Sequence, residues 1–275
     1  MQISGRLAVV TGASSGIGEA AARLLGRRGA RVALVARSQG PLEAVAAGVR
    51  TGGGTAWAFP ADLSRPEEIA RVAAAIQAEA GLPDLLVNNA GAGRWRAVDE
   101  TSLEEAAELI AVPYLAAFGM TRAFLPGMIA RGSGWIVNVT SAVAHLMVPG
   151  ATAYGVARWA MRAFSAGLRA DLRGTGVGVT LVTAGKVSTP YFAHNPGSEE
   201  RIPRIARLAP TLSPEEVAEA MLRGVERERR EVLVPRLVRF LVWAHRHWPG
   251  PVGALIDLGG WRRPEGGGAG RAPHG

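Results

Sequence analysis

The chain has 275 residues, of which 48% are hydrophobic and 20% are charged. These proportions are typical of a folded globular protein and exclude an intrinsically disordered chain. The length allows one large domain, and nothing in the composition requires a second. There is no cysteine, which excludes a disulfide framework, a zinc–thiolate site and a cysteine nucleophile.

The formal net charge is +8, and Lys186 is the only lysine among 31 basic residues. The arginines are scattered through the chain and form no continuous stripe, so we expect no nucleic-acid binding. The first residues lack the pattern of a secretion signal, and we expect no apolar run long enough to span a membrane. Together with the lack of cysteine, this predicts a cytoplasmic protein.

Short apolar runs alternate with longer segments of helical period, the pattern of a parallel sheet covered by helices on both faces. We therefore predict an α/β, doubly wound, three-layer sandwich with a seven-stranded, mostly parallel sheet. The predicted strands are Leu7–Val10, Arg31–Ala36, Ala56–Pro60, Asp84–Asn88, Gly134–Thr140, Val177–Val182 and Glu231–Val234. The predicted helices include Gly16–Arg28, Pro66–Ala80, Leu103–Ala130, Thr152–Arg173 and Pro214–Glu228.

These elements predict one domain over residues 1–260. The segment 185–212 carries four prolines and no clean period, so we expect a loop that covers a substrate. Residues 235–260 are predicted to form a C-terminal helical extension. It either packs on the domain, the favoured interpretation, or lies on a membrane surface. Residues 261–275 are rich in glycine and proline, which predicts a disordered tail.

A glycine-rich segment follows the first predicted strand and opens the first predicted helix. Glycine at positions 12, 16 and 18 lets the backbone turn tightly and approach a pyrophosphate, while the helix N-terminus supplies N–H donors. The segment therefore predicts a dinucleotide site in a Rossmann-type domain. The predicted phosphate contacts are Gly12, Ser14, Ser15, Gly16, Ile17 and Gly18.

The spacing Gly-x-x-x-Gly-x-Gly after Thr11 resembles the short-chain dehydrogenase/reductase family. Further motifs follow in the family's order from about Arg6 to Val234: Asp62 after the third strand, Asn88-Asn89-Ala90-Gly91 after the fourth, Ser141 with Tyr154, and Gly185-x-Val187-x-Thr189. The resemblance implies a nicotinamide-dependent oxidoreductase acting on a carbonyl or alcohol. It also implies cofactor contacts at Asp62, Leu63, Asn89, Ala90, Gly91, Tyr154, Arg158, Gly185, Val187 and Thr189.

The end of the second predicted strand bears on the choice of cofactor. NAD-type sites carry an acidic residue there to bind the ribose hydroxyls, whereas this chain has Ala36 and Arg37. The guanidinium of Arg37 suits a 2′-phosphate, which favours NADP(H) over NAD(H). The alternative is that Arg37 is one more solvated arginine.

The resemblance makes Tyr154 the general acid or base and Ser141 the group that holds the substrate oxygen. The family has a lysine four residues after the tyrosine and an asparagine on the preceding long helix, and both serve its proton relay. Here these positions carry Arg158 and Pro113. Arg158 can bind the ribose and stabilise a phenolate, but it stays protonated and passes no proton on. Pro113 brings no amide and kinks a helix.

Two interpretations therefore remain open. In the favoured one the chain is a working NADP(H)-dependent oxidoreductase in which Arg158 replaces the lysine. In the other it is a degenerate family member that binds NADP(H) but is redox-inactive or catalyses a non-redox reaction.

The substrate side is predicted from residues after the fourth and fifth strands and in the loop. They suggest a mostly apolar small molecule and no metal site. The predicted lining residues are Arg94, Trp95, His145, Met147, Tyr191 and Phe192. The helices beginning at Leu103 and Thr152 resemble those through which family members form dimers and tetramers, so we expect a homodimer or homotetramer.

Overall fold

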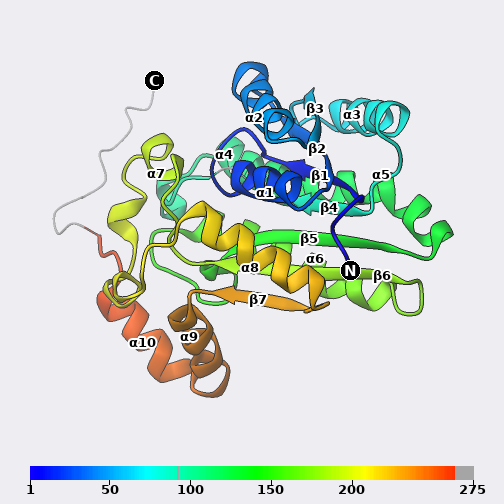
Figure 1. Cartoon of the computed structure of the whole chain (residues 1–275). Helices are drawn as coiled ribbons and strands as arrows, with labels where there is room; N and C mark the ends of the chain where they lie inside the picture. Colours follow the sequence, from blue (N-terminus) through cyan, green and yellow to red (C-terminus); the bar gives the residue numbers. More distant parts are fainter. Residues whose placement is uncertain (92, 264–275) are drawn as a thin grey trace.

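The computed structural model describes residues 1–91 and 93–263. Its seven strands form one sheet in the order β3-β2-β1-β4-β5-β6-β7, and every neighbouring pair is parallel. This confirms the predicted α/β architecture, visible in Figure 1. The strands are β1 Leu7–Thr11, β2 Arg31–Ala36, β3 Thr55–Pro60, β4 Leu85–Asn88, β5 Gly134–Ser141, β6 Val177–Ala184 and β7 Glu231–Val234.

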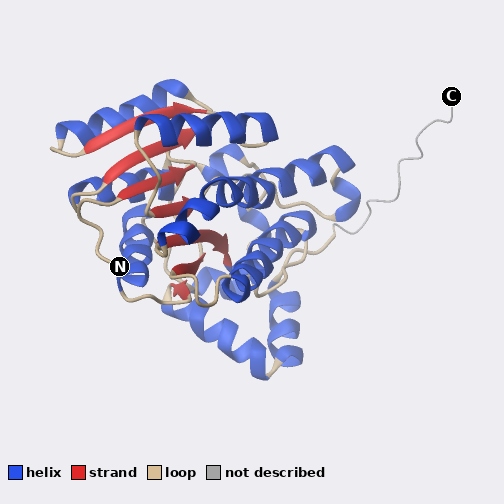
Figure 2. Ribbon diagram, turned by 90° about the vertical axis from the view of Figure 1, so that its right-hand side faces the viewer, coloured by secondary structure: helices blue, strands red, loops and turns tan. Residues whose placement is uncertain are grey.

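Helices cover both faces of the sheet, as the edge-on view in Figure 2 shows. The central strands are buried on both sides because each face carries its own hydrophobic core. One face carries α1 Gly16–Arg27, α2 Gln39–Thr51 and α8 Pro214–Glu226. The other carries α3 Pro66–Glu79, α5 Ala116–Arg131 and α6 Thr152–Asp171. The prediction did not single out α2, whose Gly40, Pro41 and Gly48 are poor helix formers.

The strand order reverses between β1 and β4, which lie side by side in the middle of the sheet. In doubly wound sheets the loops after the strands diverge at this point and leave a crevice at the carboxyl ends. The loops after β1, β4, β5 and β6 therefore meet at one edge of the sheet.

The predicted long helix from Leu103 is divided. It consists of α4 Leu103–Ile110, a π-helical turn at Ala111–Leu115 (η2) and α5 Ala116–Arg131. Pro113 is buried within the π-helical turn. Proline lacks an N–H donor and its ring crowds the preceding turn, so it cannot occupy regular α-helix without cost, and the wider π turn accommodates it.

The combined segment Leu103–Arg131 corrects the expectation that no apolar run is long enough to span a membrane. By length and composition alone it is a helical stretch that could cross a membrane, the one such stretch among the described residues. This is weak evidence for a membrane span, because a core helix passes the same test, and Met120, Phe124 and Met128 of α5 are fully buried against the sheet.

The segment 185–212 contains only short helical turns, among them α7 Tyr191–His194. Beyond β7 the chain forms the predicted helical extension, α9 Arg236–His247 and α10 Pro249–Gly259, which occupies the lower corner of Figure 1. Trp261, which the sequence placed in the tail, packs against the domain, because the guanidinium carbon of Arg201 lies 4.4 Å from the centroid of its ring. Residues 264–275 lie outside the described part of the chain.

Candidate active site

A cavity of about 650 Å³ lies at the carboxyl ends of the strands. The segments that follow β1, β2, β3, β4, β5 and β6 all contribute to it, together with α6, α9 and α10. Most of the sequence-predicted site residues line this one cavity. They are Gly12, Ser14, Ser15, Gly16, Ile17, Arg37, Asp62, Leu63, Asn89, Ala90, Gly91, Trp95, Ser141, Tyr154, Arg158, Gly185, Val187, Thr189, Tyr191 and Phe192.

The glycine-rich loop is packed too tightly for side chains. Gly12 has φ +63°, and a Cβ there would lie 2.9 Å from the Cα of Ala90. A Cβ on Gly18 would lie 2.1 Å from the carbonyl oxygen of Gly12, so Gly18 serves loop packing and does not line the cavity. Ser15 is the N-cap of α1 and makes no side-chain capping bond. Ser15, Gly16 and Ile17 line the cavity, so the start of α1 borders it, and the first N–H groups of a helix are available there as donors.

Thr11 joins the ends of β1 and β4. Its hydroxyl donates to the carbonyl of Val87 (3.2 Å) and accepts from the backbone N–H groups of Asn89 and Ala90 (3.0 Å each). The amide of Asn89 donates to the carbonyls of Thr11 and Gly12. This hydrogen-bond set holds the glycine-rich loop against the end of β4 and fixes the floor of the cavity.

Arg37 and Asp62 lie on the cavity wall beyond the glycine-rich loop. Asp62 accepts hydrogen bonds from the backbone N–H and hydroxyl of Ser64, at 3.0 and 2.8 Å. These two bonds lower the pKa of Asp62, and the charges of Arg37 and Arg65 lower it further. Arg37 is also exposed to solvent, so its charge lies where the cavity opens to solvent.

Tyr154 and Arg158 stand one turn apart on the same face of α6, and both are buried. The guanidinium carbon of Arg158 lies 4.7 Å from the centroid of the Tyr154 ring, in cation–π contact. A Cβ on Gly91 would lie 2.9 Å from a terminal guanidinium nitrogen of Arg158. Glycine at position 91 therefore leaves the space that the large guanidinium fills.

Two aromatic side chains also pack against the Tyr154 ring. The rings of Trp95 and Tyr191 lie 5.5 and 6.2 Å from the Tyr154 ring, centroid to centroid. The hydroxyl of Tyr191 donates to the carbonyl of Gly93 (2.7 Å). Burial is the main cause that raises the pKa of Tyr191 well above its ordinary value, with the charge of Tyr154 second. Tyr191 therefore remains a neutral hydroxyl that braces the loop after β4.

Three predicted lining residues are placed elsewhere. His145 lies inside the fold, where its Nε2 is 3.1 Å from the hydroxyl of Thr183 and 3.4 Å from a carboxylate oxygen of Glu231. Met147 is exposed beside Gly155, and Arg94 is exposed beside Glu105, 3.7 Å away. None of the three belongs to the cavity wall. After β5 the wall is formed instead by Val143, Leu146 and Val148.

Sequence reasoning missed the apolar end of the cavity. Val238 and Leu241 of α9 and Ile256 of α10 form part of this wall, opposite residues of the segment 185–212. The sequence carried a signal for this wall, because Val238, Leu241 and Val242 recur at the spacing of one helix face. In the structure these three residues and Ile256 are buried. The segment 185–212 contributes Ile202, Pro203, Ile205, Ala206 and Ala209. We call this apolar end, from α9, α10 and the segment 185–212, the apolar chamber.

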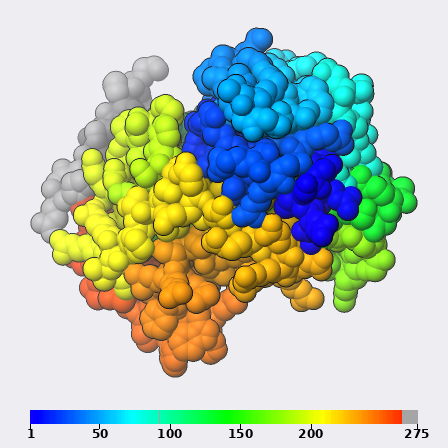
Figure 3. Space-filling view, viewed as in Figure 1, coloured from blue at the N-terminus to red at the C-terminus, as the bar shows by residue number. Residues whose placement is uncertain are grey.

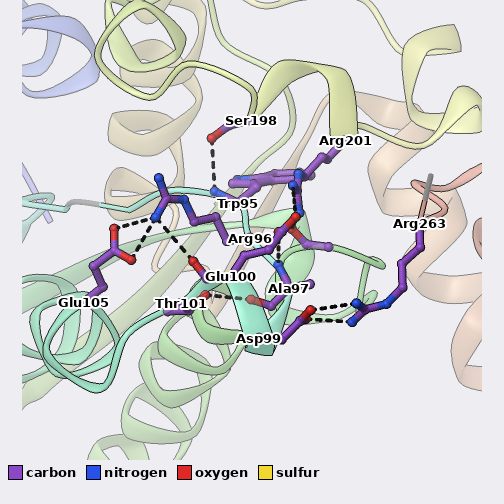
Figure 4. Close-up of polar contacts among 11 residues, drawn as sticks. Trp95, Arg96, Ala97, Asp99, Glu100, Thr101, Glu105, Ser198, Arg201 and Arg263 are labelled. Carbon is purple, nitrogen blue, oxygen red and sulfur yellow. Dashed lines mark hydrogen bonds and ion pairs between the residues drawn. The ribbon is translucent and has the colours of Figure 1, made fainter. Parts of the chain in front are cut away.

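Polar contacts tie the segment 185–212 down over the cavity (Figure 4). The guanidinium of Arg201 binds the two carboxylate oxygens of Glu100, at 2.6 and 2.9 Å, and also donates to the carbonyl of Gly150. The buried hydroxyl of Ser198 accepts from the backbone N–H of Trp95 (3.0 Å). The segment is thus anchored to the chain after β4, and we call it the lid.

The sheet is parallel, and the glycine-rich loop lies where its strand order reverses, in one cavity with Tyr154. This arrangement defines a nucleotide-binding Rossmann-type oxidoreductase. Residues 6–199 match the family model of the short chain dehydrogenases. The chain therefore belongs to the short-chain dehydrogenase family.

Individual relatives agree with this assignment. The chain is 33% identical over 232 residues to a fatty acyl-CoA reductase of Acinetobacter baylyi, covering 84% of this chain and 76% of that protein. It is 32% identical over 250 residues to estradiol 17-beta-dehydrogenase 11 of Mus musculus, covering 90% of this chain and 81% of that protein. A solved metagenomic short-chain oxidoreductase in complex with NADP superposes with a TM-score of 0.72 at 34% identity, covering 85% of this chain and 98% of that one.

Proposed function

We propose that the protein is an NADP(H)-dependent oxidoreductase that interconverts a carbonyl and an alcohol on a mostly apolar small molecule. One observation carries the proposal: a single cavity runs from the glycine-rich loop, past Ser141 and Tyr154, into the apolar chamber. A dinucleotide at the first end and an apolar substrate at the other would meet at Tyr154. The relatives named as reductases and dehydrogenases of apolar compounds support the same class of reaction.

The residues at the first end fit a nicotinamide dinucleotide. Gly12 and Gly16 line the cavity, and the close approach of Ala90 and Thr189 leaves no room for a Cβ at either position; the N-terminus of α1 borders the same cavity, where its N–H groups would bind the phosphates. Arg37 would bind a 2′-phosphate, Asp62 the adenine side, and Val187 and Thr189 the nicotinamide side. When bound, the cofactor supplies or accepts the hydride. The structure with NADP at 34% identity supports the choice of NADP(H) over NAD(H).

Tyr154 would donate the proton to the carbonyl oxygen during reduction and accept it during oxidation, and Ser141 would orient that oxygen. Arg158 would stabilise the charged form of Tyr154 through its position over the ring. It would not relay the proton, because a guanidinium stays protonated. Pro113 supplies no amide for a relay water, so neither the side chain at position 113 nor that at position 158 would pass a proton to Tyr154.

The direct test follows NADPH oxidation by the purified protein with ketones and aldehydes of increasing chain length. We expect turnover with apolar carbonyls and its loss in Tyr154→Phe, with NADPH binding unchanged. Tyr114→Phe, in the π-helical turn outside the cavity wall, is the matched control and keeps the wild-type rate. NADPH oxidation that survives Tyr154→Phe unchanged contradicts this mechanism.

The second candidate is a family member that binds NADP(H) without turning over carbonyls. Arg158 and the buried Pro113 support it, since both fall on the family's proton relay. Tight NADPH binding without turnover, and turnover gained on Arg158→Lys with Pro113→Asn, would favour this candidate.

We also propose a cytoplasmic homodimer or homotetramer. The outer surfaces of η2, α5 and α6 expose Leu115, Phe118, Val156 and Trp159, which gives an apolar face for a second copy. Light scattering on the eluting protein measures the oligomer. We expect Phe118→Ser with Trp159→Ser to shift it toward monomer, and an unchanged mass contradicts this assignment.

A further inference from the structure

The outward surface of α9 and α10 combines arginines with large aromatic side chains. On α9 the exposed positions Arg236, Arg239, Phe240, Trp243 and Arg246 follow the spacing of one helix face. At the following corner and on α10 the exposed residues include Trp248, Leu255 and Leu258. We call these eight residues the outer face. In the space-filling view α9 projects from the lower surface of the molecule, shown in orange (Figure 3).

The aromatic residues of the outer face are ordered against one another yet open to solvent. Trp243 lies 5.9 Å from Phe240 and 5.5 Å from Trp248 between ring centroids. Phe240 is 56% exposed, Trp248 54% and Leu258 69%. A soluble surface scatters such residues singly, whereas an adjoining group of this size indicates a surface that binds something.

The charge of the outer face favours an anionic partner. The outer face carries Arg236, Arg239 and Arg246 and no acidic residue, and of these arginines Arg246 is paired with Glu231 at 3.5 Å. A hollow of about 350 Å³ lies on α9 between Arg236, Arg239, Phe240 and Trp243. Arginine beside tryptophan and phenylalanine is the combination that holds an amphipathic helix at a phospholipid interface, with the guanidinium groups at the phosphates.

The lengths of the helices decide how they can meet a membrane. α9 has 12 residues and α10 has 11, or about 18 and 16 Å at 1.5 Å per residue. A spanning helix needs about 20 apolar residues, so this hairpin is suited to lie in the interface and not to cross the bilayer.

A second copy of the chain fits the outer face less well. A two-fold symmetric contact brings the same surface of each copy together, so Arg236, Arg239 and Arg246 would face a like-charged surface. The α5–α6 surface, with Phe118 and Trp159, offers an apolar contact without this repulsion.

The inner face of the same hairpin forms the wall of the apolar chamber through Val238, Leu241 and Ile256. Only the thickness of one helix layer separates the outer face from the substrate end of the cavity. An apolar substrate dissolved in a bilayer would therefore be close to the chamber when the outer face is docked.

We propose that the outer face of α9 and α10 binds anionic phospholipid membranes as an interfacial hairpin, and that the chamber behind it takes its apolar substrate from that surface. The second half rests on the proposed function. The first half stands on the arginines, the exposed aromatic cluster and the short helices alone.

The test is co-flotation of the NADPH-loaded full chain with vesicles. Vesicles of phosphatidylcholine are compared with vesicles of phosphatidylcholine and phosphatidylglycerol, at low and high salt. We expect binding to the second kind and its weakening by salt. Arg236→Gln with Arg239→Gln lowers the affinity about fivefold for each charge removed. Phe240→Ser with Trp243→Ser lowers it on the order of tenfold or more. Val98→Ser with Leu103→Ser, which removes exposed apolar side chains away from both the outer face and the α5–α6 surface, leaves vesicle binding unchanged.

NADPH binding, measured for each variant, confirms that the variants are folded. No binding to anionic vesicles, or equal binding by the Phe240/Trp243 variant, overturns the proposal. Dissociation of a wild-type oligomer by Phe240→Ser with Trp243→Ser makes the outer face an interface between copies and also overturns it. Because vesicle binding needs no turnover, an inactive protein that binds vesicles rejects the proposed function and leaves membrane docking in place.

Discussion

The guanidinium of Arg158 lies over the ring of Tyr154, 4.7 Å from its centroid, and fills the space left by Gly91. A lysine at position 158 would bring a compact charge on a flexible stem, whereas the arginine brings a planar group that stacks on the ring. Residues 91, 154 and 158 are therefore fitted to one another, which supports the interpretation that Arg158 is a working part of the site.

Removing the charge at position 158 tests this interpretation. We expect Arg158→Met to lower kcat by about a hundredfold or more, as the loss of a preorganised charged group does elsewhere. Arg158→Lys should keep measurable turnover because the charge remains. Arg162→Lys is the matched control, since Arg162 lies one turn further along α6 and stacks on Trp159 at 5.1 Å. Steady-state kinetics with NADPH and an apolar ketone decide, and equal rates for Arg158→Met and wild type contradict the role of Arg158.

Arg37 predicts the choice of cofactor. A charge-assisted contact is worth about 1.5–3 kcal/mol, so Arg37→Ala should weaken NADPH binding roughly tenfold to a hundredfold. The affinity for NADH should change little, because NADH lacks the 2′-phosphate. The control is Arg65→Ala, which removes a charge that also acts on Asp62 but lies outside the cavity wall. Titration of cofactor fluorescence gives both dissociation constants, and equal losses for NADPH and NADH exclude this role of Arg37.

The sheet was predictable because buried parallel strands are near-continuous apolar runs, and β1 to β7 agree with the predicted strands within two residues at either end. The sequence predicted that Pro113 kinks its helix, but it did not predict that the kink takes the form of a π-helical turn. The motifs identified the residues around Tyr154 that share the cavity, since most of them follow a strand of one parallel sheet, and Tyr154 and Arg158 lie on α6, the first long helix after β5. Spacing along the chain gave no information on side-chain direction after β5, where His145 points inward and Leu146 reaches the cavity.

The lid anchor should control substrate affinity. The side chain of Arg201 is only 14% exposed, and Glu100 binds it through both carboxylate oxygens. Glu100→Gln leaves this guanidinium poorly compensated, which costs on the order of 1–2 kcal/mol and should raise KM roughly tenfold with a smaller change in kcat. The neighbouring pair of Asp99 and Arg263 is exposed, so Asp99→Asn should have little effect. Equal KM values for the two variants contradict the anchoring role.

His145 should make the protein less stable in mild acid. Burial is the main cause that lowers the pKa of His145 from 6.5 to about 4, and the charges of Arg162 and Arg246 act in the same direction. The unfolded chain takes up a proton near pH 6.5, whereas folded His145 stays neutral until about pH 4. Its contribution to the free energy of unfolding is therefore complete above pH 6.5 and is lost as the pH falls to about 4, by about 3 kcal/mol.

Urea unfolding at a series of pH values checks this with His145→Gln, which cannot titrate but can still hydrogen-bond to Thr183. Carboxylates titrate in the wild type and the variant alike, so the difference between their unfolding free energies isolates His145. We expect this difference to change in favour of the variant by about 3 kcal/mol between pH 7 and pH 4. A difference between wild type and His145→Gln that does not vary with pH shows that His145 is not held neutral by burial.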